Sequence, residues 1–245
     1  MRISLEQALD ILMDHVTQGR TERKPLEQCL GLVLSQDVFA LLDMPPFSRS
    51  AQDGYALCSK DSVGVDAENP VKLKVTGKIY AGDYLDIQVR SGEAVRIMTG
   101  AMIPAGADCV LRQEDTDEGE NVVQIYKEVE PGGSICFKGE EYKKGHILLH
   151  AGTKIDAAAL AVASGNGIME LPVYERVRAA VVSSGSEVVE PGTPLTPGKI
   201  YNTNTIYMKA RLKQLGANVV MTRTVGDELG IMREALNEAA SQSEL

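Results

Sequence analysis

The sequence predicts a multidomain protein that combines an α+β part with an α/β part. An amphipathic helix opens the chain, a middle region consists of short alternating strands separated by Gly, Pro and Asp clusters, and the last region alternates strands with helices. At 245 residues the chain exceeds one typical domain. We therefore expect a discontinuous helical and extended linker domain at 1–45 and 146–175, an inserted β-rich domain at 46–145, and a truncated α/β domain at 176–245.

The linker domain has clear helix signals. Ser4 precedes the segment LEQALDILMDHV, whose apolar residues recur at helical spacing, and Gln7 completes a Ser-x-x-Gln capping box. Pro25 then opens a stretch in which helical spacing gives way to an apolar run, which predicts a helix followed by a strand. Asp156 is expected to cap a short helix, AAALAVAS, that ends at the glycines beyond it.

The β-rich domain is predicted to be a small sandwich or barrel. Four strands are expected, at 71–80, 94–100, 107–115 and 121–129. The second and third of these are interpreted as a β-hairpin with a long turn, in which Thr99 would only cap the turn.

The α/β domain is predicted from a strand at 177–182, a helix at 204–216 and a strand at 218–225, after which Asp227 begins a second helix. Two strands joined by a helix form one parallel βαβ unit. Parallel sheets are normally buried on both faces, and two strands offer too little core to stand alone. We therefore expect this domain to be truncated.

Composition argues against several classes of protein. The formal net charge of −9 does not supply the clustered Lys and Arg that binding to nucleic acid requires. No apolar run approaches the ~18 residues of a membrane helix, and the N-terminus lacks a signal-peptide core, so a cytoplasmic protein without membrane contact is expected. The His and Cys spacings match no zinc site or disulfide framework, so buried thiols are expected at Cys29, Cys58, Cys109 and Cys136.

Two polar segments lie where strands of the α/β domain end. Residues 184–187, Ser-Gly-Ser-Glu, follow the first parallel strand, and Asp227 follows the second. Open α/β sheets bind ligands at this edge, where N–H groups and hydroxyls can hold phosphate and carboxylates can hold Mg²⁺. The plainer interpretation makes Glu187 an exposed capping residue and Asp227 a helix N-cap worth ~1 kcal/mol.

A third polar segment, PPFSRSAQDGYAL, spans 45–57 and contains the Asp53-Gly54 pair. Asp-Gly is a common tight-turn dipeptide, so by itself it indicates a structural turn. The two prolines stiffen the approach, and the side chains of Ser48, Ser50 and Gln52 could orient or bind an anion. Both interpretations of Asp53 stay open on these grounds.

Four segments recur in this order in one family: PPFSRSAQDGYAL, GEAVRIMTGAMIPAGADCVLRQED, GEEYKKG and SSGSEVVEPGTPLTPGKIYNTNTIYMKARLKQLGANVV. With them the chain resembles the molybdopterin molybdenumtransferases, which include bacterial MoeA and the gephyrin E domain. The resemblance implies insertion of molybdate into adenylylated molybdopterin, with release of AMP and assistance by Mg²⁺. It also implies a molybdopterin-binding type of α/β domain, and a homodimer whose active site lies between the α/β domain of one subunit and the β-rich domain of the other.

The resemblance also implies roles for individual residues. It implies that Glu187 and Asp227 hold Mg²⁺ against the phosphates and act with Asp53 in catalysis. The residues that it implies in substrate binding are Thr99, Glu141, Ser184, Gly185 and Asn202.

The chain departs from the family pattern at a few positions. Ser48-Arg49 replaces an Asp-Asn pair, Ser186 replaces an acidic residue, and Asn202 stands where the family often has Asp. Members continue with a phosphate-binding loop, SGGVSVG, so this chain by itself is expected to be inactive. The alternative hypothesis is a non-catalytic dimeric scaffold or interaction module of the gephyrin E-domain type.

Overall fold

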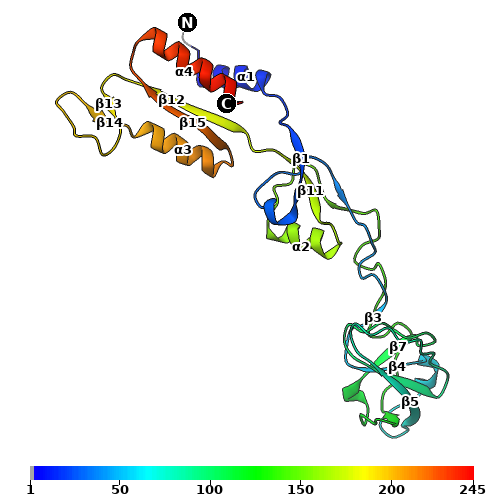
Figure 1. Ribbon diagram of the computed structural model, residues 1–245. Coiled ribbons are helices and arrows are strands. Elements are labelled where there is room, and N and C mark those ends of the chain that lie inside the picture. The colour runs from blue at the N-terminus through cyan, green and yellow to red at the C-terminus, as the bar shows by residue number, and fades with distance from the viewer. Residues whose placement is uncertain (1–2) are drawn as a thin grey trace. The chain divides into compact units, whose positions relative to one another are not determined.

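The computed structural model describes residues 3–245, which form two compact units (Figure 1). The first unit consists of Met1–Val38 and Leu148–Leu245, and the second consists of Phe39–Ile147. The sheets are mixed in type, five of them two-stranded and one five-stranded, and helices accompany those of the first unit. This confirms the predicted multidomain α+β and α/β class. None of the helices within 3–245 has the length and apolar character that crossing a membrane requires.

The first unit begins with helix α1 (Leu5–His15). Its capping box is formed as predicted: Ser4 Oγ accepts from the N–H of Gln7 at 3.2 Å, and Gln7 Oε1 accepts from the N–H of Ser4 at 3.0 Å. No side chain of α1 is buried, and its apolar face, which includes Leu5, Leu12 and Met13, is exposed. Local capping therefore defines this helix without tertiary burial.

A small core follows, built on the antiparallel pair β1 (Thr21–Pro25) and β11 (Glu170–Tyr174). Helix α2 (Ala157–Gly165) begins as predicted, with Asp156 Oδ1 accepting from the N–H of Ala159 at 2.8 Å. The predicted helix after Pro25 is wrong, since only the 3₁₀ turn η1 (Leu26–Gln28) forms. Apolar residues beyond this turn enter the core instead. The core consists of Cys29, Leu32, Leu34, Val38, Ile155, Ala159, Ala163, Leu171 and Val173.

The α/β part confirms the predicted parallel unit. Strand β12 (Arg178–Ser184) pairs in parallel with β15 (Asn218–Val225), and helix α3 (Asn204–Gln214) connects them. Helix α4 (Leu229–Gln242) follows β15, and Figure 1 shows α3 and α4 on opposite sides of the strand pair. The connection between β12 and α3 contains a second parallel pair, the two-residue strands β13 (Val188–Val189) and β14 (Ile200–Tyr201).

The chain beyond α4 returns to the free side of β12. The N–H of Leu245 donates to the carbonyl of Arg178 at 3.2 Å, and the N–H of Ala180 donates to the carbonyl of Leu245 at 2.8 Å. This is the hydrogen-bond pattern of a parallel neighbour. Because crossovers between parallel strands are right-handed, a chain that moves back across β12 needs its helix on the other face of the sheet. This accounts for the opposite placement of α3 and α4.

The second unit contains a five-stranded sheet in the order β7-β4-β6-β5-β8. The strands are β4 (Gly54–Leu57), β5 (Val71–Ile79), β6 (Glu93–Ile97), β7 (Cys109–Arg112) and β8 (Val122–Ile125). Shorter elements complete the chain: β2 (Val38–Phe39), β3 (Arg49–Ser50), η2 (Ser59–Ser62), η3 (Gln113–Asp115), β9 (Ile135–Cys136) and β10 (Ile147–Leu149).

The predicted hairpin of the second and third expected strands is wrong. Strands β6 and β7 each pair with β4, which lies between them. All four residues of β4 are buried, with Tyr55 and Leu57 in one core cluster and Ala56 in the other. A Cβ on Gly54 would lie 2.0 Å from the carbonyl oxygen of Leu111, so only glycine fits. Gly54 therefore serves close strand packing rather than a turn.

The four cysteines are free thiols. Cys29, Cys58 and Cys109 are buried as predicted, whereas Cys136 is half-buried. Burial raises the pKa of the Cys109 thiol to about 12, so this thiol stays protonated at neutral pH.

Candidate functional site

Asp53 immediately precedes β4 and is held by Thr99, which lies just beyond β6. Asp53 Oδ1 accepts from both the backbone N–H and the Oγ1 hydroxyl of Thr99, each at 2.7 Å. These two hydrogen bonds, with a smaller contribution from the Arg96 charge, hold the pKa of the exposed Asp53 carboxyl below its ordinary value. The structure thus brings two predicted site residues together and presents an ionised carboxylate.

Arg96 is a member of this cluster that the sequence prediction missed. Its Nη1 donates to the Tyr55 hydroxyl at 2.9 Å, its Nη2 donates to Gln113 Oε1 at 3.0 Å, and its guanidinium lies 5.4 Å from the centre of the Tyr55 ring. An Arg at an alternating strand position looks like an ordinary exposed residue. Its role appears only once β4 is known to lie beside β6, because Tyr55 and Arg96 are opposite each other in that register.

Glu141 lies near Arg49. The Arg49 Nη2 atom is 3.9 Å from Glu141 Oε1, and both side chains are well exposed. Within 3–245 no hydrogen bond or ion pair joins Glu141 to Asp53 or Thr99. Arg49, one of the two residues that depart from the family pattern, is therefore close to the predicted site residue Glu141. At this distance and exposure their ion pair contributes little energy.

Asp227, just beyond β15, forms two hydrogen bonds with Ser186, which lies in the loop after β12. The N–H of Ser186 donates to Asp227 Oδ2 at 3.0 Å, and the N–H of Asp227 donates to Ser186 Oγ at 3.3 Å. The hydrogen bond from the Ser186 N–H, with a smaller contribution from the Ser186 side chain, lowers the pKa of the exposed Asp227 carboxyl. The N-cap of α4 is Glu228, so the plainer interpretation of Asp227 as the N-cap, and the prediction that it begins the helix, are wrong.

The loop that follows β12 places Glu187 at the same sheet edge as Asp227. Ser184 pairs in register with Val225, so the chain segments after both strands emerge together. Glu187 is exposed, and no hydrogen bond joins it to Asp227 within the described chain. The same residues contain no group of three or more His, Cys, Asp or Glu arranged to hold a metal. The two carboxylates share an edge without forming a closed protein cage.

Gly185 was predicted to donate its N–H to the ligand, but this N–H has a partner within the protein. Its N–H already donates to the carbonyl of Val225 at 3.1 Å and is not available to a ligand. Its φ of +145° favours glycine, and an added Cβ would approach Glu187 Oε2 and Val188 Cγ2 at 2.8 Å each. Gly185 therefore shapes the loop, whereas the neighbouring Ser184 is exposed.

Asn202 lies at the centre of a buried polar network and is only 3% exposed. Its Nδ2, which carries two N–H donors, lies within hydrogen-bond distance of three acceptors: Thr224 Oγ1 at 2.8 Å, Thr205 Oγ1 at 2.9 Å and Glu190 Oε1 at 3.0 Å. The N–H of Thr205 donates back to Asn202 Oδ1 at 3.1 Å, and Thr224 Oγ1 donates to Glu190 Oε1 at 2.8 Å. An amide can donate where a carboxylate cannot, which accounts for an Asn beside Glu190.

Glu190 is a second residue that the sequence prediction missed. In the parallel pair of β13 and β14, Val188 is opposite Ile200 and Val189 is opposite Tyr201. The next residues along each chain are Glu190 and Asn202. Two short apolar pairs, VV and IY, each followed by a polar residue, are the signal that could have indicated this contact.

Family models match nearly the whole chain. A model described as the MoeA N-terminal region (domain I and II) matches residues 3–167. A model described as a probable molybdopterin binding domain matches residues 180–245.

Curated proteins and solved structures are similar to the chain over its full length. Molybdopterin molybdenumtransferase 2 of Mycobacterium tuberculosis (strain ATCC 25618 / H37Rv) is 42% identical over 99% of this chain and 60% of that protein. A molybdopterin molybdenumtransferase of Staphylococcus epidermidis (strain ATCC 12228 / FDA PCI 1200) is 36% identical over 99% of this chain and 58% of that protein. The crystal structure of a molybdopterin biosynthesis MoeA protein from Pyrococcus horikoshii superposes with a TM-score of 0.91 at 31% identity, covering 100% of this chain and 63% of that one. The chain thus spans about 60% of the length of the curated relatives it matches.

Proposed function

The chain belongs to the MoeA family, and from this premise we propose that it is part of a molybdopterin molybdenumtransferase. The whole protein would insert molybdate into adenylylated molybdopterin and release AMP. The observation that supports this most directly is the similarity to named molybdenumtransferases along 99% of the chain. The scaffold alternative is not favoured, because these relatives bear the names of enzymes.

The carboxyl edge of β12 and β15 supports a substrate role for this unit. Asp227 is kept ionised by Ser186, and its Oδ1 atom accepts no hydrogen bond from the described residues. The exposed hydroxyl of Ser184 can donate to a phosphate oxygen at the same edge. Lys199 Nζ donates to the carbonyl of Ser186 at 2.6 Å, which holds the loop in place and puts a positive charge nearby. An adenylylated, phosphate-bearing ligand fits this chemistry.

Mg²⁺ also fits the residues at this edge. Mg²⁺ usually takes one or two carboxylates together with water and substrate phosphates rather than a complete protein cage. Glu187 and Asp227 are exposed carboxylates at one sheet edge, and Oδ1 of Asp227 is open to a ligand. We propose that these two residues hold the ion. Bound there, Mg²⁺ would supply Lewis-acid polarisation of the phosphoanhydride.

The roles of the second unit are proposed on its own geometry. Asp53 presents an ionised carboxylate that Thr99 orients through two short hydrogen bonds. We propose that Asp53 positions a donor group of the substrate and that Glu141 contributes to substrate binding. We propose a cytoplasmic homodimer as well. The exposed apolar face of α1, with Leu5 72% and Met13 68% exposed, is a surface that a second copy could cover.

The proposed activity is tested by molybdate-dependent release of AMP from adenylylated molybdopterin, measured with the full-length protein that contains this chain. Asp227→Asn removes the charge with little change in shape, and we expect release to fall by about 100-fold. Asp66→Asn is the matched control, because Asp66 is also an exposed carboxylate whose pKa backbone hydrogen bonds lower, and it lies elsewhere. Release by this control should stay within about twofold. An Asp227→Asn protein as active as the control would overturn the proposal.

A further inference from the structure

The first unit contains a polar cavity of about 950 Å³, away from the candidate site. It is lined by Arg178, the first residue of β12, and by Asn218 and Val219, the first residues of β15. Ser184 and Asp227 lie at the other end of the same strands. The cavity is therefore at the amino edge of the sheet, whereas the candidate site is at the carboxyl edge.

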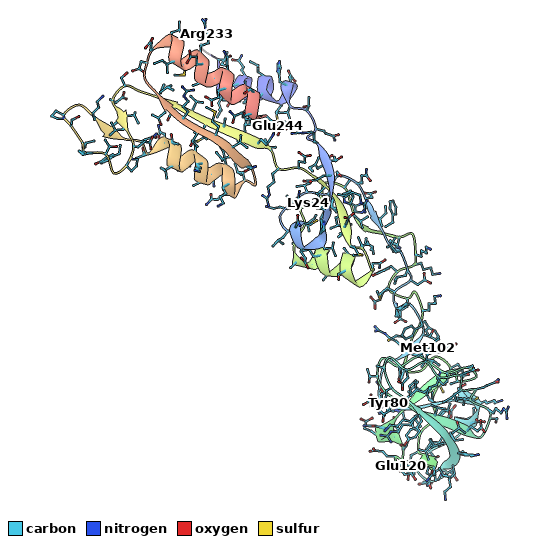
Figure 2. The ribbon with its side chains drawn as sticks, in the orientation of Figure 1. Lys24, Tyr80, Met102, Glu120, Arg233 and Glu244 are labelled. Carbon is cyan, nitrogen blue, oxygen red and sulfur yellow. The ribbon has the colours of Figure 1, made fainter. Side chains whose placement is uncertain are left out.

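The lining of this cavity is strongly basic in a chain whose net charge is −9. Two acidic residues line it, and each already has a basic partner: Glu22 forms an ion pair with Lys24, and Glu175 Oε2 lies 3.6 Å from Arg20 Nε. The lining cations are Lys24, Arg176, Arg178, Lys209 and Lys213. Figure 2 labels Lys24, which lies on β1.

Secondary structure places these cations on facing surfaces. Lys209 and Lys213 are four residues apart on α3 and so share one face of that helix. Arg176 and Arg178 both line the cavity from the short segment that leads into β12. Arg176 Nη1 donates to the carbonyl of Gly216 at 3.1 Å, which fixes its guanidinium beside the end of α3. Within 3–245 neither lysine forms an ion pair.

Arg178 has donor capacity that the protein does not use. Its Nη2 atom is 3.7 Å from Glu244 Oε1, but its Nε atom is buried without a hydrogen-bond partner among the described residues. A buried donor without a partner costs about 1–3 kcal/mol. The Arg178 side chain also lines the cavity, and its Nη atoms form no hydrogen bond with the described residues, so an oxyanion there would provide acceptors for these Nη donors.

The helix dipole offers a plainer explanation for part of this cluster. Cations in the last turn of a helix are stabilising by themselves, and Lys213 and Arg211 lie in the last turn of α3. Arg211, however, donates to Gln214 and does not line the cavity. The dipole gives no reason for Lys24, which lies on β1, or for Arg176 and Arg178, which lie where the chain enters β12. The convergence of three separate segments on one cavity points to a ligand.

We propose that this cavity binds the phosphate group of a small molecule, as a doubly charged oxyanion. Two paired acids leave a surplus of three positive charges in the lining, which suits a phosphomonoester. Lysine and arginine supply the charge-assisted hydrogen bonds that hold phosphate in proteins. The site is separate from the proposed molybdenumtransferase site and does not depend on that function.

The experiment titrates the 245-residue chain with inorganic phosphate, AMP and adenosine, and records both calorimetric affinity and amide NMR shifts. We expect phosphate and AMP to bind and adenosine not to bind. We expect the shifts to centre on Lys209, Gly216 and Asn218, with Ser184 and Asp227 unmoved by inorganic phosphate. Binding should weaken steeply as salt is raised.

Two variants make the test specific. Lys209→Gln with Lys213→Gln should weaken phosphate binding at least tenfold, whereas Arg211→Gln removes one charge from the same helix outside the cavity and should change it less than twofold. Unperturbed amide spectra establish that each variant is folded. The proposal is overturned if wild type fails to bind millimolar phosphate, if Arg211→Gln loses as much affinity as the double variant, or if the shifts centre on Ser184 and Asp227. The wild-type shifts decide the matter even if the double variant does not fold.

Discussion

Asp53 in the second unit and Asp227 in the first share one kind of hydrogen bond and differ in the sheet that supports them. Each carboxylate accepts a backbone N–H from a hydroxyl residue, Thr99 or Ser186, and each carboxyl has its pKa lowered mainly by that bond. Each is exposed, so burial is not what sets its charge state. One local arrangement, a carboxylate against the N–H of a Ser or Thr, thus keeps both groups ionised.

The sheets that carry the two carboxylates differ in size and in how far their strands are buried. Asp53 adjoins β4, the fully buried strand second from one edge of a five-stranded sheet, with a core cluster on each face. Asp227 adjoins β15, in which only Val225 is buried, within a pair of strands. Helices α3 and α4 leave Tyr207 and Leu229 exposed. The ionisation of each carboxyl is therefore set by its local hydrogen bonds. Its rigidity depends on the number of strands and the amount of buried core that support the adjoining strand.

The largest contrast is expected from adding one methyl group beside each site. Gly54→Ala forces a Cβ against the Leu111 carbonyl, a backbone atom that cannot move without opening β4 from β7, so we expect a loss of at least ~3 kcal/mol in unfolding free energy. Gly185→Ala meets only the side chains of Glu187 and Val188 at a positive φ, so we expect ~1–2 kcal/mol. Hydrogen exchange by mass spectrometry, read separately for the strands of each unit, measures both effects. Equal effects in the two units would contradict the comparison.

A smaller effect is expected from Asn202→Asp, which tests the polar network below the thinner site. The new carboxylate can no longer donate to Glu190 and would face it with like charge, so we expect a loss of ~2 kcal/mol at neutral pH. The repulsion raises the folded-state pKa of the introduced carboxyl above its unfolded value. The loss of stability relative to wild type should therefore be smallest at low pH and should grow as pH rises through that folded pKa.

The control for this prediction is the double variant Asn202→Asp with Glu190→Gln, in which an amide and a carboxylate exchange places. Urea unfolding followed by circular dichroism should show recovery of more than half of the lost stability. No recovery would mean that Asn202 acts through its other partners.

The side-chain contributions of Thr99 and Ser186 predict similar changes in the pKa of Asp53 and Asp227 when either hydroxyl is removed, with little change in stability. Thr99→Val and Ser186→Ala each remove the side-chain contribution and keep the larger backbone one, so the pKa of Asp53 or Asp227 should rise only part of the way to its ordinary value. A lowered folded-state pKa contributes stability above the unfolded value, and this is lost as pH falls through the folded pKa. Each variant should therefore lose less stability on acidification than wild type. Carbon-detected NMR titration of the carboxyl groups measures the two shifts, and a full return to the ordinary value would assign the effect to the hydroxyl.

The smallest effect is expected from Arg49→Ala. The ion pair with Glu141 is long and exposed, so its loss should change stability by less than about 0.5 kcal/mol. A larger change in urea unfolding would show that Arg49 contributes through packing of its stem.

Features of the fold that depend on neighbours in sequence could be predicted well. The Ser4–Gln7 capping box and the Asp156 cap form as expected, because each needs only three or four consecutive residues. The strand predicted at 218–225 has the bounds Asn218–Val225, since alternation along a strand is also local. The polar segments that contain the candidate site residues are also visible in short stretches of sequence, whereas the roles of those residues stay predictions.

Features that depend on distant pairing could not be predicted. Residues 54–57 gave no strand signal beside the Asp-Gly pair, so β6 and β7 were paired with each other instead of with β4. Thr99 contacts Asp53, and Arg96 contacts Tyr55, because β4 lies beside β6, so both contacts were missed together with the pairing of β4. Glu190 escaped notice for the same reason, because its contact with Asn202 depends on the register of two very short strands.

The position of β4 also sets the order in which the second unit can be assembled during synthesis. Residues 54–57 leave the ribosome well before both of their neighbours, at 94–97 and 109–112. Contacts this far apart in sequence slow folding, because the loop must close before the pairing rewards it. The most buried strand of this sheet therefore has no partner until residues 94–97 have been made and lacks its second partner until Arg112 follows, so its apolar residues stay exposed on the nascent chain during that interval.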